Sequence, residues 1–369
     1  MKKVISLMFV MVLFFSMALT GCEKAENTSS ADETKTTETE EATQQPTEAP
    51  TYNAGSNKYA FIICGAEMRS SAHQAMWNGA EKFAKETGVP IKWFHAETDA
   101  EAEVVVTQII AEGYNVIFSV SGNISEKLLA LSKENPNTTF VSMENEVDPE
   151  GAANFISATL KAEDPGFIAG YIAAKKTQTN KVALVGATDN YVAQQFEAGF
   201  IDGVIYVNKT DNKKVKFAID YVGTSYDRKG GYAMAEKFYN DGNDVVFTTG
   251  GAETGGGAVF AAKTLGKQII TVGNMYYIAP DDVIAAVKKA VDTNTYDVVM
   301  GVFTGAIKGG DKTAAGIDSE KVGFISSPQA EKYLGEDLIS EIDEISQKLI
   351  SGEIEVHNKV DAKLKYDQD

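Results

Sequence analysis

From residue 58 onward, apolar runs without polar alternation take turns with stretches of helical period. The runs Tyr59–Ile63, Ile91–Phe94, Val116–Val120 and Thr139–Met143 are separated by helix-like stretches near 73–87, 99–112 and 124–134. Continuous apolar runs of this length are typical of parallel strands that are buried on both faces. The pattern therefore predicts successive βα units, which form an open parallel sheet flanked by helices.

The same pattern then starts again, which predicts a second sheet. Its strands are expected at Lys181–Gly186, Phe217–Val222, Asp244–Thr248 and Gln268–Val272, with helices near 190–206, 228–241 and 254–266. A single core stops growing near ~250–300 residues, so 369 residues favour two lobes over one larger sheet. Between the two series, Phe167–Ala174 reads as a helical crossover whose small residues allow close packing.

The C-terminal part adds too few elements for a third domain. It contains strand-like runs at Val283–Val287, Val322–Ile325 and Glu353–Val356, and helical stretches near 289–307 and 336–350. We expect these elements to complete both lobes, so that the chain crosses the hinge three times. The expected borders are 58–160 plus about 283–318 for lobe 1, 161–282 plus about 319–357 for lobe 2, and 358–369 for a tail.

The first 22 residues have the organisation of an export signal. Two lysines follow Met1, and the apolar run Val4–Leu19 leads to Leu19-Thr20-Gly21-Cys22. This run is shorter than a spanning helix requires. Its ending resembles the bacterial lipobox, which predicts lipidation of Cys22 and anchoring on the extracytoplasmic face of the cell membrane by several acyl chains. The alternative is an ordinary secretory signal with an incidental cysteine.

Residues 23–57 are rich in Thr, Glu, Ala, Gln and Ser and contain almost no large apolar side chains. Such a segment cannot bury enough surface to offset its ordering entropy. We interpret it as a disordered acidic tether, with an adhesive or mucin-like role as the alternative. The only other cysteine is Cys64 at the end of an apolar run, so we expect a small buried side chain and no disulfide framework.

Charge narrows the range of partners. The chain has 52 acidic and 34 basic side chains, a net charge of −18. A nucleic-acid binder needs a basic face that displaces counterions, so no nucleic-acid partner is expected. A small anion held locally by one or two cationic side chains is still compatible with this charge.

A search for catalytic and metal-binding motifs is negative. The histidines His73, His95 and His357 are dispersed, no ligand-spaced cysteine pair exists, and no G-x-S-x-G elbow is present. The stretch 257–264 approaches the P-loop pattern but has Ala262 where the second glycine is needed. We therefore expect no enzyme activity, no cofactor and no metal.

In open α/β sheets, ligands bind outside the carboxyl ends of the strands. Two facing lobes turn this edge into a cleft that closes by hinge motion. The glycine-rich stretch 250–257 follows the strand Asp244–Thr248 and opens a helix, so its backbone could approach a ligand closely at Gly251. The alternative is a tight βα turn in which glycine serves conformation only.

Several motifs, taken in order, resemble one known family. Those motifs are the Trp77/Gly79 helix (H-Q-x-x-W-x-G, where the family has N-Q-x-x-W-x-G), the strand Gly113–Phe118 (G-Y-N-V-I-F), the crossover Ala169–Ala174 (A-G-x-x-A-A), Phe196–Phe200 (F-x-x-G-F), Gly250–Lys263 (G-G-…-A-A-K, with Ala252-Glu253 inserted before Thr254) and Leu349–Val356 (ending G-x-I-x-V). Together they make residues 58–357 similar to the basic membrane protein (BMP) family of ABC-transporter substrate-binding lipoproteins. The resemblance implies a type I periplasmic-binding-protein fold, no catalysis, and capture of a purine nucleoside.

The resemblance also suggests where a ligand would bind. The family's D-x-S-F-N pocket, aligned on Trp77, falls on Arg69, Ser71, Ala72 and His73, so the stacking Phe and the Asp are replaced. Glu67 or Met68 would fill part of the gap. Arg69 would face a carboxylate or phosphate, or bond a base edge. For His73 two alternatives stay open: its side chain lines the cleft, or it lies away from the cleft. Trp77 is expected to pack on the hinge side of its helix.

In the second lobe, Tyr226 is the counterpart of the family's second aromatic residue. Asn274 stands where the family has a ribose-binding Asp, and an amide can still donate to and accept from a diol. Lys289 matches the family Lys, with a solvated helix lysine as the alternative. Further polar groups available near strand ends are Asn123, Glu253 and Thr254.

The implied partners are a small-molecule ligand, with a nucleoside favoured, and the permease subunits of an ABC importer with their cytoplasmic ATPase. The protein is expected to act as a monomer. A second hypothesis is a lipoprotein that senses a sugar or another small molecule and presents it to a membrane receptor. A lipid-anchored hydrolase is disfavoured, because the sequence shows no nucleophile–base pair and no metal-binding cluster. A repressor of the same fold is disfavoured too, because the first lobe is preceded by an export signal and by no helix-turn-helix.

Overall fold

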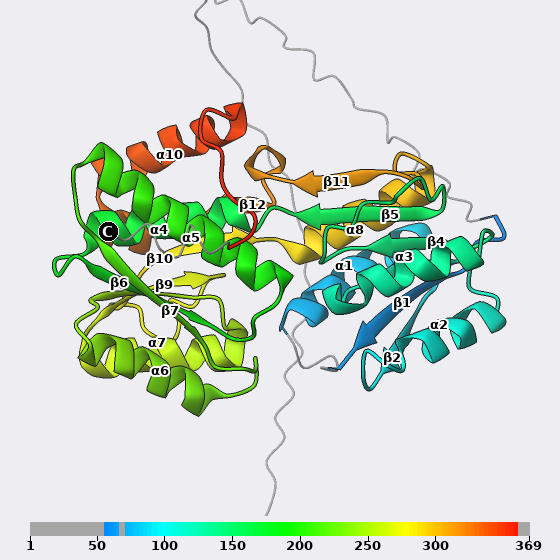
Figure 1. The fold of residues 1–369 in the computed structure, drawn as a ribbon, viewed down its shortest axis with the longest axis horizontal. Helices are drawn as coiled ribbons and strands as arrows, with labels where there is room; N and C mark the ends of the chain where they lie inside the picture. The colour runs from blue at the N-terminus through cyan, green and yellow to red at the C-terminus, as the bar shows by residue number, and fades with distance from the viewer. Residues whose placement is uncertain (1–54, 66–70, 361–369) are drawn as a thin grey trace, which may run out of the picture. The chain divides into compact units, whose positions relative to one another are not determined.

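The computed structural model describes residues 55–65 and 71–360, which belong to one compact unit, Thr51–Asp369. Within these residues, strands alternate with helices along the chain and form two six-stranded sheets flanked by helices (Figure 1). Several expectations lie outside the described residues. They concern the signal segment with Cys22, nearly all of the tether, Glu67, Arg69, and the tail from residue 361.

The first sheet has the strand order β11-β5-β4-β3-β1-β2, and its neighbouring strands are all parallel. All six residues of β1 are buried, which explains the lack of polar alternation in its sequence. The strands are β1 (Tyr59–Cys64), β2 (Ile91–Ala96), β3 (Val116–Ser119), β4 (Thr139–Ser142), β5 (Phe155–Leu160) and β11 (Lys312–Ala315).

Helices cover both faces of this sheet. Alternate residues of β1 point to opposite sides and so belong to two different cores. Phe61 and Ile63 join the core under α1 (Ser71–Thr87) and α8 (Val291–Thr304). Ala60 and Ile62 join the core under α2 (Ala102–Ala111) and α3 (Ser125–Glu134). A short 3-10 turn, η1 (Gly122–Ile124), links β3 to α3.

The second sheet has the order β12-β10-β9-β8-β6-β7, and only the β12–β10 pair is antiparallel. Figure 1 shows α6 and α7 on the face opposite α4 and α5. The strands are β6 (Lys181–Gly186), β7 (Lys216–Tyr221), β8 (Val245–Thr248), β9 (Gln268–Val272), β10 (Val283–Lys289) and β12 (Val322–Phe324). The helices are α4 (Glu163–Lys176), α5 (Tyr191–Thr210), α6 (Arg228–Asn240), α7 (Gly256–Leu265), α9 (Pro328–Leu334) and α10 (Glu336–Ser351), with short turns η2 (Gly251–Gly255) and η3 (Ile317–Ser319).

One expected lobe border is wrong. We expected lobe 1 to include about 283–318, but β10 pairs in parallel with β9, with Val287 opposite Val272, and so belongs to the second sheet. A buried apolar run looks the same in either sheet, so the sequence does not tell which neighbour it will find. The chain passes between the sheets before α4, at Ala290, and between β11 and β12.

One local expectation also needs correction. The run Glu353–Val356 is irregular instead of a strand, and its apolar residues Ile354 and Val356 pack against the core of the second lobe. Trp77 meets Trp93 of the edge strand β2 edge-on at 5.2 Å, and its place on the hinge side of α1 stays a prediction.

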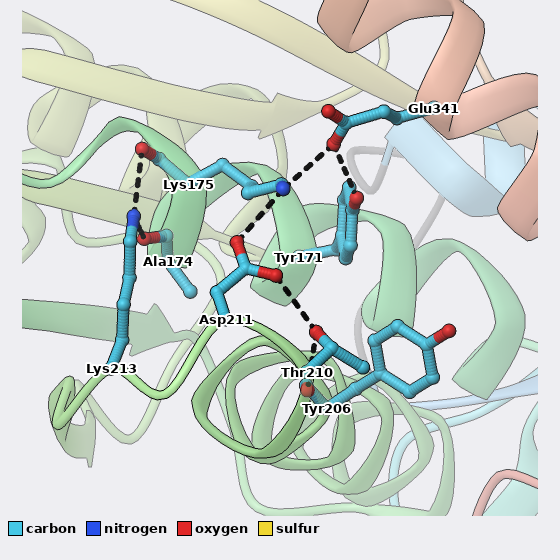
Figure 2. Close-up of polar contacts among 8 residues, drawn as sticks. All are labelled: Tyr171, Ala174, Lys175, Tyr206, Thr210, Asp211, Lys213 and Glu341. Carbon is cyan, nitrogen blue, oxygen red and sulfur yellow. Dashed lines mark hydrogen bonds and ion pairs between the residues drawn. The ribbon is translucent and has the colours of Figure 1, made fainter.

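The crossover helix α4 packs against α5 through glycines on both helices. A Cβ at Gly170 would overlap the carbonyl oxygen of Phe200, and one at Gly203 would overlap that of Phe167. This confirms the interpretation that small residues in the crossover allow close packing. The C-terminal helix α10 then docks beside α4, where Lys175 and Tyr171 contact Glu341 (Figure 2).

Candidate ligand-binding site

The polar groups that follow the strands of both sheets converge at one edge of each sheet. We define the strand-end junction as Ser71, Asn123 and Glu144, which follow β1, β3 and β4, together with Gly251, Asn274 and Lys289 at the ends of β8, β9 and β10. Parallel strands place their carboxyl ends at the same edge, and this edge is where open α/β sheets bind ligands.

An ion pair joins the two lobes at this junction. The Nζ of Lys289 lies 3.0 Å from each carboxylate oxygen of Glu144. The side chains are only 8% and 16% exposed, so the pair is largely removed from water. Lys289 is the last residue of β10, so the alternative of a solvated helix lysine is wrong. Sequence reasoning missed Glu144, although this residue directly follows the predicted strand Thr139–Met143.

A second contact joins the lobes between Gly251 and the first turn of α1. A Cβ on Gly251 would lie 3.6 Å from the Oγ of Ser71. Gly251 has φ +67°, a conformation that favours glycine, and it begins the π-helical turn η2. His73 lies on the same turn of α1 as Ser71 and is partly buried. The glycine therefore serves both the local turn and the approach of the two lobes.

Two asparagines follow the strands next to those that carry the ion pair, one on each lobe. Asn274 follows β9, which neighbours β10, and its Oδ1 accepts a hydrogen bond from the backbone N–H of Tyr276 at 3.1 Å. Asn123 lies in η1 after β3, which neighbours β4, and its amide donates to Asp99. The chain at Gly122 is packed against Asn145, next to Glu144. Both amides thus lie at the ends of strands that neighbour the strands of the charged pair.

Tyr226 reaches this region on a loop that Thr254 holds in place. The buried hydroxyl of Thr254 donates to the carbonyl of Thr224 at 2.7 Å and accepts from the N–H of Asp227 at 3.1 Å. The Tyr226 side chain is exposed. Glu253 is also exposed, and it pairs with the Nε of Arg228 at 3.2 Å. Thr254 therefore positions the Tyr226 loop against η2 through bonds made within the protein.

The chemistry of this arrangement is that of binding. Amides, a carboxylate and an ammonium supply donors and acceptors, and the loop that carries the Tyr226 ring contacts η2.

Burial raises the pKa of the Cys64 thiol to about 12, with help from the charge of Asp99. Cys64 is buried, which confirms the expectation of a small buried side chain. Among residues 55–65 and 71–360, no cluster of His, Cys, Asp and Glu could hold a metal ion. In the same part of the chain, no helix is long and apolar enough to span a bilayer.

A hollow of about 520 Å³ borders the junction on the side of α3 and α5. Asn145 and Glu146 line it from the first lobe, and Tyr191 and Gln194 line it from the second. Asn358 and Lys359 of the tail also line it. Another hollow, of about 320 Å³, lies on the surface of α6, away from the junction, and we assign no role to it.

Two parallel α/β lobes, three crossovers and facing strand ends define the type I periplasmic-binding-protein fold. A solved structure of similar fold is an ABC-transporter solute-binding protein from Aeropyrum pernix K1. It has a TM-score of 0.70 and 21% sequence identity, and the match covers 83% of this chain and 95% of that one. At this identity the likeness concerns the fold alone.

The sequence matches the Bmp family, described as "ABC transporter substrate-binding protein PnrA-like", over residues 56–359, and the chain belongs to this family. Basic membrane protein A2 of Borrelia garinii is 28% identical, with coverage of 83% of this chain and 90% of the relative. The "ABC transporter nucleoside-binding protein BmpA" of Lactococcus lactis is 26% identical over 57% of this chain and 59% of the relative. Members of this family bind substrates for ABC transporters outside the cytoplasm and are not enzymes. The family resemblance seen in the sequence is thereby confirmed.

Proposed function

We propose that this chain is the lipid-anchored binding component of an ABC importer, and that it captures a purine nucleoside or a related small polar ligand between its lobes. The observation that carries the proposal is the convergence at the strand-end junction. Glu144 of one lobe meets Lys289 of the other in a largely buried ion pair, and Asn123 and Asn274 lie at the ends of the neighbouring strands. A nucleoside needs a few fixed polar groups for its ribose and an aromatic face for its base.

The proposed ligand contacts come from both lobes. His73 and Asn123 would contribute from the first lobe, and Glu67 and Arg69, which precede α1, are also proposed there. Tyr226, the backbone of Gly251, Glu253, Asn274 and Lys289 would contribute from the second. We propose that Thr254 acts through the Tyr226 loop, since both hydrogen bonds of its hydroxyl stay within the protein. The nucleoside-binding relative from Lactococcus lactis supports this class of ligand.

The experiment is calorimetric titration of the full chain with purine and pyrimidine nucleosides, free bases, ribose and other sugars. The proposal predicts saturable binding of at least one purine nucleoside and weaker binding of the free base. Binding of a sugar without any response to nucleosides would instead favour the sensing or sugar-transport alternative. No response to any member of the panel would reject the ligand class.

The lipid anchor has a separate test. Cells that express the chain are labelled with a radioactive fatty acid, and the wild type is compared with Cys22→Ser. We expect label and membrane association in the wild type and loss of both in the variant. A labelled Cys22→Ser protein would contradict lipidation at this residue. Sedimentation of the purified chain tests the proposed monomer.

A further inference from the structure

We propose that Glu144 makes this site select uncharged, hydroxyl-bearing ligands over anionic ones, because it neutralises Lys289. The inference rests on the proposed function and sharpens it: the ligand would be a nucleoside and not its phosphate. Lys289 would then not serve as a local anion site.

The first step is the geometry of the pair. Both oxygens of Glu144 lie 3.0 Å from Nζ of Lys289, and neither side chain is more than 16% exposed. Water therefore screens the attraction only weakly, and the two charges compensate each other at short range. The ammonium is held against a fixed carboxylate on the opposite lobe.

The second step is the hydrogen-bonding capacity that the pair retains. An ammonium has three N–H donors, and a carboxylate has about four lone-pair positions. Two contacts with Glu144 leave Lys289 able to donate once more and leave Glu144 able to accept. Asn274, whose oxygen accepts from Tyr276, adds an amide that can donate. Adjacent donors and acceptors of this kind match a vicinal diol, in which each hydroxyl donates once and accepts twice.

The third step is the penalty for an anion. A phosphate or carboxylate bonded to Lys289 would have to lie beside the Glu144 carboxylate or displace it, and like charges brought together in a largely buried site are strongly disfavoured. Arg228, at the start of α6 beside η2, is paired with Glu253. Of the two roles that the sequence leaves open for Arg69, the proposal requires the one in which Arg69 bonds a base edge. Removing only the Glu144 charge would leave a largely buried ammonium uncompensated, which attracts an anion.

The experiment measures charge selectivity by calorimetry on the full chain. The ligands are inosine, adenosine and their 3′- and 5′-monophosphates, so that the anionic group is offered at both ends of the ribose. For the wild type we expect a preference for the nucleoside on the order of 100-fold. In Glu144→Gln, which keeps the shape but removes the charge, the preference should fall below about tenfold, chiefly through a gain in monophosphate affinity.

Two further variants make the result specific. Glu146→Gln removes the same charge two residues away, where Glu146 pairs with Lys312 at 2.8 Å, and it should keep the wild-type preference. The double variant Glu144→Gln/Lys289→Gln removes both charges and should gain no monophosphate affinity. Because it has no unpaired lysine, it also serves as the comparison if the single variant is destabilised by that charge.

The outcomes separate this inference from the proposed function. Wild-type protein that binds nucleoside and monophosphate equally, or a Glu144→Gln protein that keeps the wild-type preference, overturns the role of Glu144 and leaves nucleoside binding intact. Wild-type protein that binds neither class overturns the proposed function, and the role of Glu144 falls with it.

Discussion

Glu341 on the C-terminal helix α10 and Lys175 on the crossover helix α4 form an ion pair, with 2.8 Å between Oε2 and Nζ (Figure 2). Nζ of Lys175 also lies 2.9 Å from Oδ2 of Asp211, which follows α5. Tyr171 donates its hydroxyl hydrogen to the same oxygen of Glu341 at 2.6 Å. One lysine, 19% exposed at its side chain, thus ties three helices of the second lobe together.

This arrangement predicts acid sensitivity of the second lobe. Hydrogen bonds from Lys175 and Tyr171 lower the pKa of Glu341, and the bond from Lys175 lowers that of Asp211. Since the folded pKa values lie below the unfolded ones, this stabilisation is present above the usual carboxylate range and is lost as the pH falls through the folded values. Between pH 6 and pH 3, the wild type should lose about 1 kcal/mol more free energy of unfolding than Lys175→Met. This value is kept small because Glu341 is 42% exposed and solvent screens its interactions.

Urea denaturation at several pH values measures this difference. Lys348→Met is the matched control, because Lys348 on α10 pairs with Glu353 at 3.6 Å on the exposed surface. That variant should follow the wild-type pH dependence. An identical acid dependence in Lys175→Met and the wild type would refute the assignment.

A second prediction concerns the opposite pH direction, at the entry to α4. Burial raises the pKa of Glu163 to about 7 and that of Asp164 to about 6. The folded protein therefore holds more protons than the unfolded chain between the ordinary carboxylate values and pH 7. The free energy of unfolding should accordingly fall as the pH rises through this window. Glu163→Gln cannot ionise, so at pH 8 it should be more stable than the wild type by about 2 kcal/mol, and at pH 5 nearly equal to it.

The same denaturation series, at pH 5 and pH 8, checks this expectation. Glu126→Gln, which removes an exposed carboxylate from α3, should behave as the wild type at both values. A stability gain for Glu163→Gln that is equal at pH 5 and pH 8 would show that ionisation is not the cause.

A third prediction tests the packing of α4 against α5. Gly170→Ala places a Cβ on the carbonyl oxygen of Phe200 in the neighbouring helix, so the helices must move apart. We expect a loss of about 1–3 kcal/mol in the free energy of unfolding, as in other overpacked cores. Gly256→Ala at the start of α7 is the control, because its Cβ would have only ordinary contacts, with 3.8 Å to Ile278. The control should be neutral or slightly stabilising, and a comparable loss in both variants would contradict the packing argument.

A fourth prediction concerns ligand binding. Asn274→Ala removes the amide after β9, the strand that neighbours β10 and Lys289, and Tyr226→Ala removes the exposed ring on the loop that Thr254 holds. Each should weaken nucleoside binding by about 1–3 kcal/mol, the scale of a lost buried hydrogen bond or stacked ring. Phe260→Ala removes an exposed ring from α7 and should leave the affinity unchanged. Two correctly folded variants with wild-type affinity would show that the pocket lies elsewhere.

The sequence predicts most of the βα pattern, because its strands are continuous apolar runs. The edge strand β11 escapes prediction, since Lys312–Ala315 contains only small and polar residues. The strand β5, with Ser157 and Thr159 in its interior, escapes for a related reason. Both serine and threonine are buried in the sheet, so polarity alone misleads here.

The site is predictable where a local rule applies. Asn123 and Asn274 follow apolar runs, and the structure places both at strand ends. The pairing of Lys289 with Glu144 is different, because it links two lobes across 145 positions of sequence. Nothing local to either residue indicates that partner, so the lysine reads equally well as a ligand group or as a solvated side chain.

The path of the chain through both lobes also determines when each lobe can be completed during synthesis. Gly79 of α1 packs on the backbone of Asp292 in α8, and β5 pairs with β11, so the first lobe lacks a helix and its edge strand until the ribosome has passed Ala315. The core of the second lobe is complete only when α10 has been made. Neither core is therefore complete until residues near the C-terminal end of the described chain have been made, although most of their strands come earlier in the sequence.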